Sequence, residues 1–218
     1  MAIALTLVVI GYFVGSVSPS YMLVRRRLGR DIRQLGDGNA GAENVSRLVG
    51  LRPAIAVAAF DISKGLAVVL VTRGITPANQ GDNSWETQIS WEGLRCGLMV
   101  AAGAAAIIGH SWSVYLKGAG GRGAATAVGA LFGMITLPAL LVMFPAFALM
   151  WYFRSTTWGL ASFFVGTVSL TVFLGYFGLL GYSLTWVPYV VTLPALVGVI
   201  HVLSLKRSPA RAAAFSEK

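Results

Sequence analysis

The 218-residue sequence has few charged residues, since only 11% of them are Asp, Glu, Lys or Arg. A soluble domain carries about a quarter. Hydrophobic residues make up 56% of the chain, and the mean hydropathy is +0.72. Several windows stay apolar over the ~20 residues that a helix needs to cross a bilayer. The composition therefore excludes an ordinary soluble domain and predicts an all-α integral membrane protein.

Cysteine is almost missing, and Cys96 alone excludes a disulfide within the chain. No group of His, Cys, Asp and Glu has metal-ligand spacing, so we predict neither a metal nor another cofactor. No linker or repeat divides the sequence, which favours a single domain over 1–218. The first apolar segment has no basic residues before it, and we expect a retained span rather than a signal peptide.

Seven apolar segments predict a seven-transmembrane-helix bundle: 2–25, 51–72, 93–108, 123–134, 137–153, 158–180 and 186–205. The third and fourth are short, rich in Gly and Ala, and flank a glycine-dense turn. Helices of that length at membrane depth usually line a site or cavity rather than face lipid. We therefore expect the functional site beside this turn.

The positive charges fall mainly on one side of these segments. Most of the 17 Lys and Arg residues follow the first, third and fifth segments or lie in the C-terminal tail. The positive-inside rule then predicts a plasma-membrane protein with its N-terminus outside and its glycine-rich loops and C-terminus in the cytoplasm. The net charge of +9 is thus explained by orientation among membrane lipids, and we predict no nucleic-acid partner.

Two glycine-rich segments lie on the predicted cytoplasmic side: "GDGNAGAENVSR" at 36–47 and "GHSWSVYLKGAGGRGAAT" at 109–126. A glycine-rich backbone leading into a helix N-terminus offers N–H groups and a positive dipole end to an anion. The alternative is that small residues only let helices pack closely. The phosphate-binding candidates are Gly36, Gly38, Asn39, Gly41, Asn44, Arg47, Gly120, Gly121, Arg122 and Gly123.

Two carboxylates, Asp37 and Glu43, contradict a simple phosphate loop. A carboxylate ~4 Å from a phosphate charge costs about 4 kcal/mol at an effective dielectric of 20. Pairing with Arg33, Arg47 or Arg122 would relieve this repulsion but would occupy the cations expected to hold substrate. Alternatively, Asp37 could act as a catalytic base.

Three further polar residues interrupt apolar sequence. Asp61 and Lys64 are spaced i, i+3 in the second segment, where charges are costly and usually paired. They predict a structural ion pair, although a direct catalytic role stays open. His110 opens the second glycine-rich segment and is a general-base candidate as well as a candidate structural hydrogen-bonding residue.

These motifs resemble the PlsY family, membrane acyltransferases that move an acyl group from acyl-phosphate to glycerol 3-phosphate. The family patterns Y-x-x-G-S-x-P-x-x-Y and G-S-G-N-x-G-A-T-N-V-x-R are met at Tyr12, Gly15, Ser16, Tyr21, Gly36, Gly38, Asn39, Gly41, Ala42, Asn44, Val45 and Arg47. D-x-x-K-G is met at Asp61, Lys64 and Gly65, and G-H at Gly109 and His110. The resemblance, which covers nearly the whole chain, implies a seven-helix fold with a cytoplasm-facing site.

The sequence departs from the family at polar positions. Asp37 and Glu43 stand for Ser and Thr, and K-G-G-K-G-V-A-T aligns to 119–126 with Ala119 and Arg122 at the lysines. Gly159 stands for a Ser before "LAS", and the C-terminal R-H-x-x-N-I-x-R pattern is barely matched by "SLKRSPAR". Because of these departures, the sequence leaves three alternatives.

The first alternative is the usual family reaction, giving lysophosphatidate for phospholipid synthesis, with acyl-phosphate and glycerol 3-phosphate as partners. The second is an acyltransferase with a changed acceptor, bound or activated by Asp37 or Glu43. The third is a noncatalytic subunit of a larger membrane protein complex, because relaxed selection on catalysis would alter several polar positions and leave glycines intact. We take the first as the prediction.

Overall fold

The computed structural model describes residues 2–76 and 85–205, with side chains described except at 85–92 and 205. Every regular element in this part of the chain is helical, which confirms the all-α prediction. The α-helices are α1 (Ala2–Ser16), α2 (Pro19–Leu28), α3 (Ala42–Leu48), α4 (Leu51–Ile75), α5 (Trp85–Ser111), α6 (Ala124–Met134), α7 (Thr136–Tyr152), α8 (Thr156–Tyr176) and α9 (Val187–Leu205). Short 3₁₀ turns lie at η1 (Ile32–Gln34), η2 (Val114–Leu116), η3 (Leu179–Gly181) and η4 (Leu184–Trp186).

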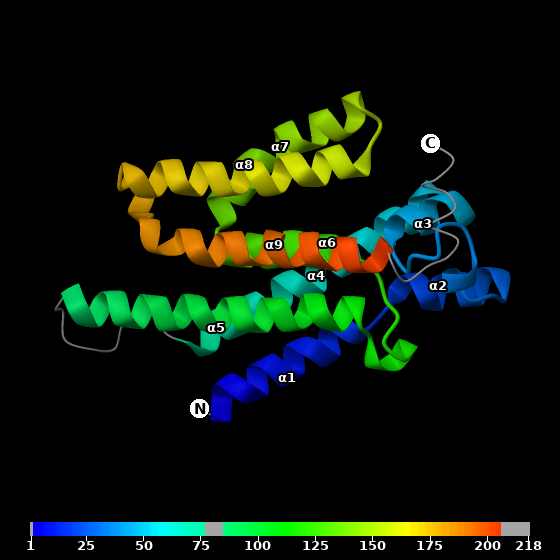
Figure 1. Ribbon diagram of the computed structural model, residues 1–218, viewed down its shortest axis with the longest axis horizontal. Helices are drawn as coiled ribbons and strands as arrows, with labels where there is room; N and C mark the ends of the chain where they lie inside the picture. Colours follow the sequence, from blue (N-terminus) through cyan, green and yellow to red (C-terminus); the bar gives the residue numbers. More distant parts are fainter. Residues whose placement is uncertain (1, 77–84, 206–218) are drawn as a thin grey trace.

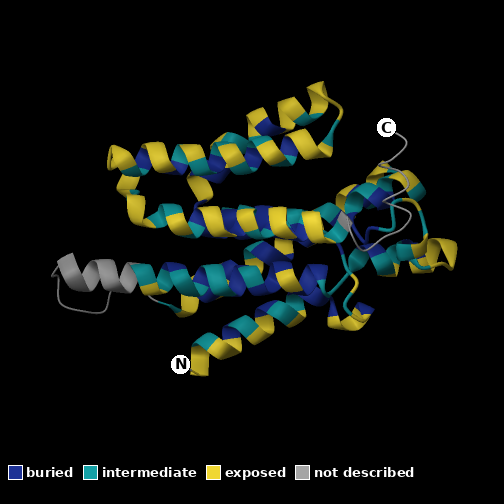
Figure 2. Cartoon of the chain, in the orientation of Figure 1, coloured by how far each residue is buried: buried dark blue, intermediate teal, exposed yellow. Residues whose placement is uncertain are grey.

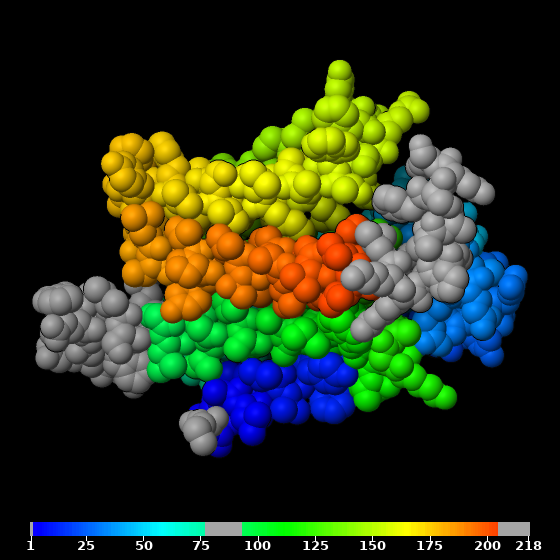
Figure 3. Space-filling model, in the orientation of Figure 1, coloured from blue at the N-terminus to red at the C-terminus, as the bar shows by residue number. Residues whose placement is uncertain are grey.

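The long helices form a bundle, with α8, α9, α5 and α1 in successive rows on one face (Figures 1 and 3). The closest pairs are α1 with α5, α4 with α6, and α7 with α8. The short helices α2 and α3 lie together at one end of the bundle, on the right in Figure 1. That end also holds the turn between α5 and α6, so both glycine-rich segments meet there.

The first predicted span, 2–25, is divided into two helices. α1 ends at Ser16, and α2 begins at Pro19 with its N-terminus capped by the Ser18 hydroxyl, which accepts from the Tyr21 N–H at 3.4 Å. A capping serine followed by proline is a strong helix start, because proline lacks the N–H that the preceding turn would need. The prediction of one continuous helix here was wrong for this reason.

The contact between α4 and α6 is a backbone-to-backbone approach. A Cβ built on Gly129 would overlap the carbonyl oxygen of Ile62, and one on Gly65 would overlap the carbonyl oxygen of Thr126. Glycine at both positions therefore lets the helices approach more closely than any side chain would allow. This contact fixes the start of α6 against the middle of α4.

The third predicted helix is longer than expected, because α5 runs over 27 residues, Trp85–Ser111. The prediction of a short third helix was wrong: the polar stretch before residue 93 continues the helix, and hydropathy alone does not mark a helix end. The fourth is short as predicted, with 11 residues between Gly123 and Ile135. Among the described residues, five stretches are long and apolar enough to cross a membrane, and the first of them, Ala2–Leu28, includes both α1 and α2. The helices α6 and α7 are shorter.

Buried side chains gather where α4, α5 and α6 meet, whereas the outer faces of α7 and α8 are exposed (Figure 2). Those outer faces are apolar: Phe144 is 70% exposed and Trp151 84%. A soluble protein would not leave such large apolar surfaces uncovered. The pattern is typical of helices that face lipid.

Candidate functional site

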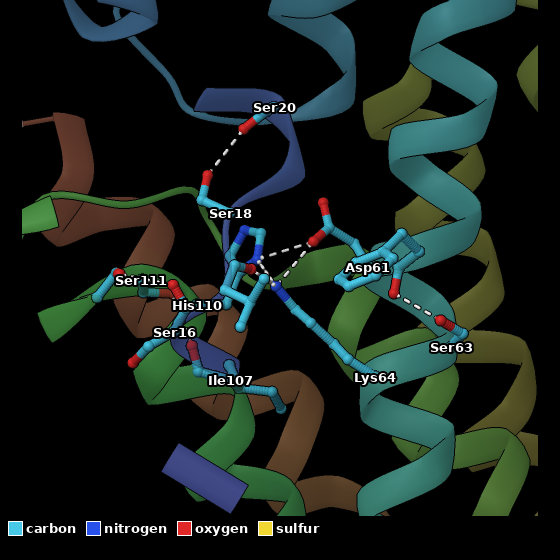
Figure 4. Close-up of polar contacts among 12 residues, drawn as sticks. Ser16, Ser18, Ser20, Asp61, Ser63, Lys64, Ile107, His110 and Ser111 are labelled. Atoms are coloured by element: carbon cyan, nitrogen blue, oxygen red, sulfur yellow. Dashed lines mark hydrogen bonds and ion pairs between the residues drawn. The ribbon is translucent and has the colours of Figure 1, made fainter. Parts of the chain in front are cut away.

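A buried charged cluster joins α4 to the end of α5. Lys64 Nζ lies 2.8 Å from Asp61 Oδ1 and 2.8 Å from His110 Nδ1, and it donates to the Val17 carbonyl at 3.0 Å. His110 Nδ1 is 3.3 Å from Asp61 Oδ1. The side chains of Asp61 and Lys64 are 2% and 3% exposed, and Figure 4 shows both pointing at the imidazole. The predicted ion pair is therefore present, and His110 belongs to the same cluster.

The first glycine-rich segment is an ordered loop that leads into α3. The buried Asn44 amide donates to the carbonyls of Leu35 and Asn39 at 2.9 and 3.1 Å, so it ties the two ends of the loop together. A Cβ on Gly36 would overlap the Asn44 amide oxygen. Gly41 directly precedes the helix. Asn44 thus shapes the loop, and its expected contact with phosphate stays a prediction.

The two unexpected carboxylates are both paired with arginines. Asp37 Oδ2 lies 3.6 Å from Arg122, and Glu43 Oε1 lies 2.6 Å from Arg47. Glu43 Oε2 also accepts from the Thr156 hydroxyl at 3.1 Å, which links α3 to the start of α8. The acids therefore neutralise the two arginines expected to hold phosphate. Because these pairs are partly exposed, each is worth only ~0–1 kcal/mol, which a bound phosphate can overcome.

The second glycine-rich segment folds back on the end of α5. The N–H groups of Gly120 and Gly121 donate to the carbonyls of Ser111 and His110 at 3.0 and 3.1 Å. These two amides are thus used within the turn. A helix leaves its first N–H groups without partners inside the helix, and no side chain caps the N-terminus of α6 after Gly123. The amides left without a partner at this site therefore belong to the first turn of α6 rather than to Gly120 and Gly121, and phosphate binding here stays a prediction.

The two segments meet at Gly121. A Cβ on Gly121 would overlap His110 Nε2 and would lie 2.9 Å from the carbonyl oxygen of Ala40. With the Arg122–Asp37 pair beside it, this contact brings together both glycine-rich segments and the histidine. Arg122 Nε and the Thr126 hydroxyl are buried here without a hydrogen-bond partner among the described residues. An unpartnered donor beside a free helix N-terminus is suited to an anion.

Sequence reasoning missed one anchor of the site. Arg33 forms a bidentate pair with Asp31, whose closest atoms are 2.6 Å apart, and it also donates to the Leu116 carbonyl at 2.7 Å. The Arg33 hydrogen bonds lower the pKa of the Asp31 carboxyl against the opposing effect of burial. The arginine thus joins the basic segment before the first loop to the second loop. Residues spaced i, i+2 do not face each other on a helix, so the spacing of Asp31 and Arg33 did not predict their pairing.

Most of the C-terminal pattern in "SLKRSPAR" (204–211), including Ser208 and Arg211, lies outside the described residues, as does the side chain of Leu205. Among the side chains that the structure describes, at 2–76 and 93–204, no group of three His, Cys, Asp or Glu could hold a metal ion.

Comparison with known proteins identifies close relatives. The profile of the glycerol-3-phosphate acyltransferase family matches residues 5–211. A glycerol-3-phosphate acyltransferase of Halalkalibacterium halodurans is 35% identical over 95% of this chain and 89% of its own. Glycerol-3-phosphate acyltransferase 4 of a Dehalococcoides mccartyi strain is 32% identical over 94% and 98%. The crystal structure of the integral membrane enzyme PlsY in its glycerol 3-phosphate form superposes with a TM-score of 0.71 at 25% identity, covering 94% of this chain and 90% of that one.

Proposed function

Because the chain belongs to the glycerol-3-phosphate acyltransferase family, we propose that it transfers an acyl group from acyl-phosphate to glycerol 3-phosphate. In this reaction a hydroxyl oxygen of glycerol 3-phosphate bonds to the acyl carbon, and the bond from that carbon to the phosphate oxygen breaks. The products are lysophosphatidate and inorganic phosphate, which carries away the hydroxyl proton. One observation carries the proposal: Arg122, His110 and the uncapped start of α6 converge where the two loops meet.

The proposed acyl transfer suits a site that consists of hydrogen-bond donors and positive charges. Acyl-phosphate is already activated, so the protein mainly has to position two anionic substrates and stabilise charge. We propose that Arg122, Arg47 and the first N–H groups of α6 hold phosphate oxygens, that Asn39 and the flanking glycines shape the pocket, and that His110 acts on the reacting groups. Asp37 accepts from the Asn39 N–H at 3.0 Å and pairs with Arg122, so we assign it to positioning the arginine. A catalytic role for Asp37 stays a prediction.

The function is tested with purified full-length protein, palmitoyl phosphate and glycerol 3-phosphate. We expect lysophosphatidate and inorganic phosphate in equal amounts, and Arg122→Gln to lower kcat/KM by about 10- to 100-fold, the worth of a charge-assisted hydrogen bond. Arg27→Gln, at an exposed position of α2, is the matched control and should stay near wild type. Folded wild-type protein that forms no lysophosphatidate would overturn the proposal.

A noncatalytic role in a membrane complex is the second candidate, and one observation favours it. Both candidate phosphate-binding arginines are paired with acids, Arg122 with Asp37 and Arg47 with Glu43. If this pairing marks a lost activity, the purified chain should be inactive alone and should remain with other membrane proteins in mild detergent. Isolation of an active single chain would exclude that role.

Replacing the acid beside Arg122 should improve substrate binding. We expect Asp37→Ser to lower the KM for glycerol 3-phosphate about tenfold, because it removes carboxylate repulsion and frees Arg122 from its partner. Steady-state kinetics with glycerol 3-phosphate as the varied substrate measure this change. Arg27→Gln, at an exposed position of α2, is again the control. An unchanged KM, or a switch to another acceptor, would show that Asp37 serves something other than the Arg122 pair.

We propose that the site end of the bundle faces the cytoplasm and the N-terminus of α1 lies outside, in the plasma membrane. The arginine-rich α2 lies at this end, opposite the turn between α8 and α9 (Figure 1). Because Cys96 is buried, a single introduced cysteine can report the side. We expect a membrane-impermeant thiol reagent to label Thr185→Cys but not Arg26→Cys in intact cells. The reverse pattern would invert the orientation.

A further inference from the structure

Lys64 has two hydrogen-bond partners and one ion-pair partner inside the bundle. A lysine ammonium has three N–H donors and no acceptor. Three acceptors surround Nζ: Asp61 Oδ1 at 2.8 Å, the Val17 carbonyl at 3.0 Å and His110 Nδ1 at 2.8 Å. A charged group taken out of water needs such partners, since each missing one is costly. The geometry therefore fits a charged ammonium whose third proton points at the imidazole.

This arrangement determines which imidazole nitrogen carries the proton. In neutral histidine one ring nitrogen donates and the other accepts. If Nδ1 of His110 carried a proton, that proton would face the Lys64 ammonium at 2.8 Å. Donation from Nδ1 to Asp61 would have to use the longer 3.3 Å contact and break the Lys64 contact. A doubly protonated ring would place two positive charges 2.8 Å apart. The arrangement favours a neutral His110 with its proton on Nε2.

The Nε2 atom lies where the two glycine-rich segments meet. The missing side chain at Gly121 leaves room for it, and the Ala40 carbonyl borders the same point from the first segment. No hydrogen bond from Nε2 is present among the described residues, in contrast to the two hydrogen bonds and the ion pair that surround Lys64. An N–H group at Nε2 would therefore be directed at the proposed phosphate site, beside Arg122.

We propose that Lys64 is a positioning residue that fixes His110 in its Nε2–H form, so that His110 donates a hydrogen bond to a phosphate oxygen of the substrate. This inference rests on the proposed function for the identity of the substrate, but the proton position does not. It replaces the general-base role suggested by the sequence, because a base would need a free electron pair at Nε2. Asp61 balances the charge of the Lys64 ammonium.

The proton position can be measured without any substrate. Full-length protein labelled with ¹⁵N-histidine in detergent should give a His110 signal with protonated Nε2 and unprotonated Nδ1. The chain has two histidines, so His201→Gln identifies the His110 signal. In Lys64→Met the preference for Nε2–H should weaken. Since that variant leaves Asp61 unpaired, the double variant Asp61→Leu/Lys64→Met provides the same comparison in a neutral cluster. A proton on Nδ1 in the wild type, or a ratio unchanged in the double variant, would overturn the proposal.

Two substitutions of His110 then distinguish a hydrogen-bond donor from a general base. A glutamine amide nitrogen can take the place of Nε2–H, whereas the shorter asparagine amide reaches only the position of Nδ1. We expect His110→Gln to retain about a tenth of wild-type kcat/KM and His110→Asn to lose about 100-fold, the worth of a hydrogen bond to a charged group. Equal, near-complete loss in both would indicate a base and overturn the proposal. Wild-type protein without acyltransferase activity would overturn the proposed function, and the NMR result would still decide the tautomer.

Discussion

Replacing Gly129 with leucine should unfold the bundle or separate its central helices. The new side chain would occupy the space of the Ile62 carbonyl on α4, and a backbone cannot move aside as a flexible side chain can. Overpacking in a tight core costs ~1–3 kcal/mol for a few extra methylene groups. Because even the first added carbon meets backbone here, we expect a loss above about 3 kcal/mol. Thermal unfolding of the purified protein and its yield in the membrane fraction would measure the loss.

Gly198 provides the matched control for this substitution. It also lies within a long helix, α9, but a Cβ built there has no neighbour within 4 Å. Gly198→Leu should therefore leave the unfolding temperature unchanged or raise it slightly, since leucine has a higher helix propensity than glycine by about 1 kcal/mol. Equal behaviour of the two leucine variants would contradict the close α4–α6 contact.

The second large effect is expected from removing one charge of the buried cluster. Lys64→Met leaves the Asp61 carboxylate buried without its ammonium partner, and breaking such a pair costs about 3–5 kcal/mol. The double variant Asp61→Leu/Lys64→Met should recover most of this stability, because it removes both charges and adds apolar volume. Unfolding curves for the wild type, both single variants and the double variant give the coupling energy between the two residues.

Lys117 provides the matched control for replacing Lys64 with methionine. Its side chain is exposed in the turn after α5, so Lys117→Met should change the free energy of unfolding by less than about 0.5 kcal/mol. If Lys64→Met were as mild as Lys117→Met, the cluster would have to be hydrated or unpaired, contrary to its burial.

The sequence predicted the architecture well where it depends on hydropathy. The apolar segments correspond to long or short helices. The close contact at Gly65 and Gly129 was not predicted, because glycine content alone does not show which helices approach each other. Hydropathy could not predict that α5 begins as early as Trp85, since a helix continues through polar residues when its backbone remains hydrogen-bonded. Nor did it reveal the break before Pro19, which depends on a local serine cap.

The sequence singles out the charged residues of the candidate site, but it does not predict which of them are in contact. Asp61 and Lys64 could be paired from their spacing on one helix, yet nothing in the sequence places His110, 46 residues after Lys64, within 2.8 Å of its ammonium. The sequence offered three arginines as partners for the acids, and only the tertiary structure assigns Asp37 to Arg122 and Glu43 to Arg47. Tyr12, matched by motif alone, proves to bind backbone: its hydroxyl donates to the Trp112 carbonyl at 2.8 Å.

The break between α1 and α2 has a chemical consequence. A carbonyl inside a continuous helix is occupied by the N–H four residues later. For Val17 that residue is Tyr21, whose N–H instead binds the Ser18 hydroxyl, so the Val17 carbonyl is left to accept from Lys64. A valine therefore helps to hold a charge within the membrane through its backbone alone. The break between α1 and α2 therefore contributes to the electrostatics of the buried cluster. Restoring a continuous helix there would remove an acceptor of the Lys64 ammonium without changing any charged residue.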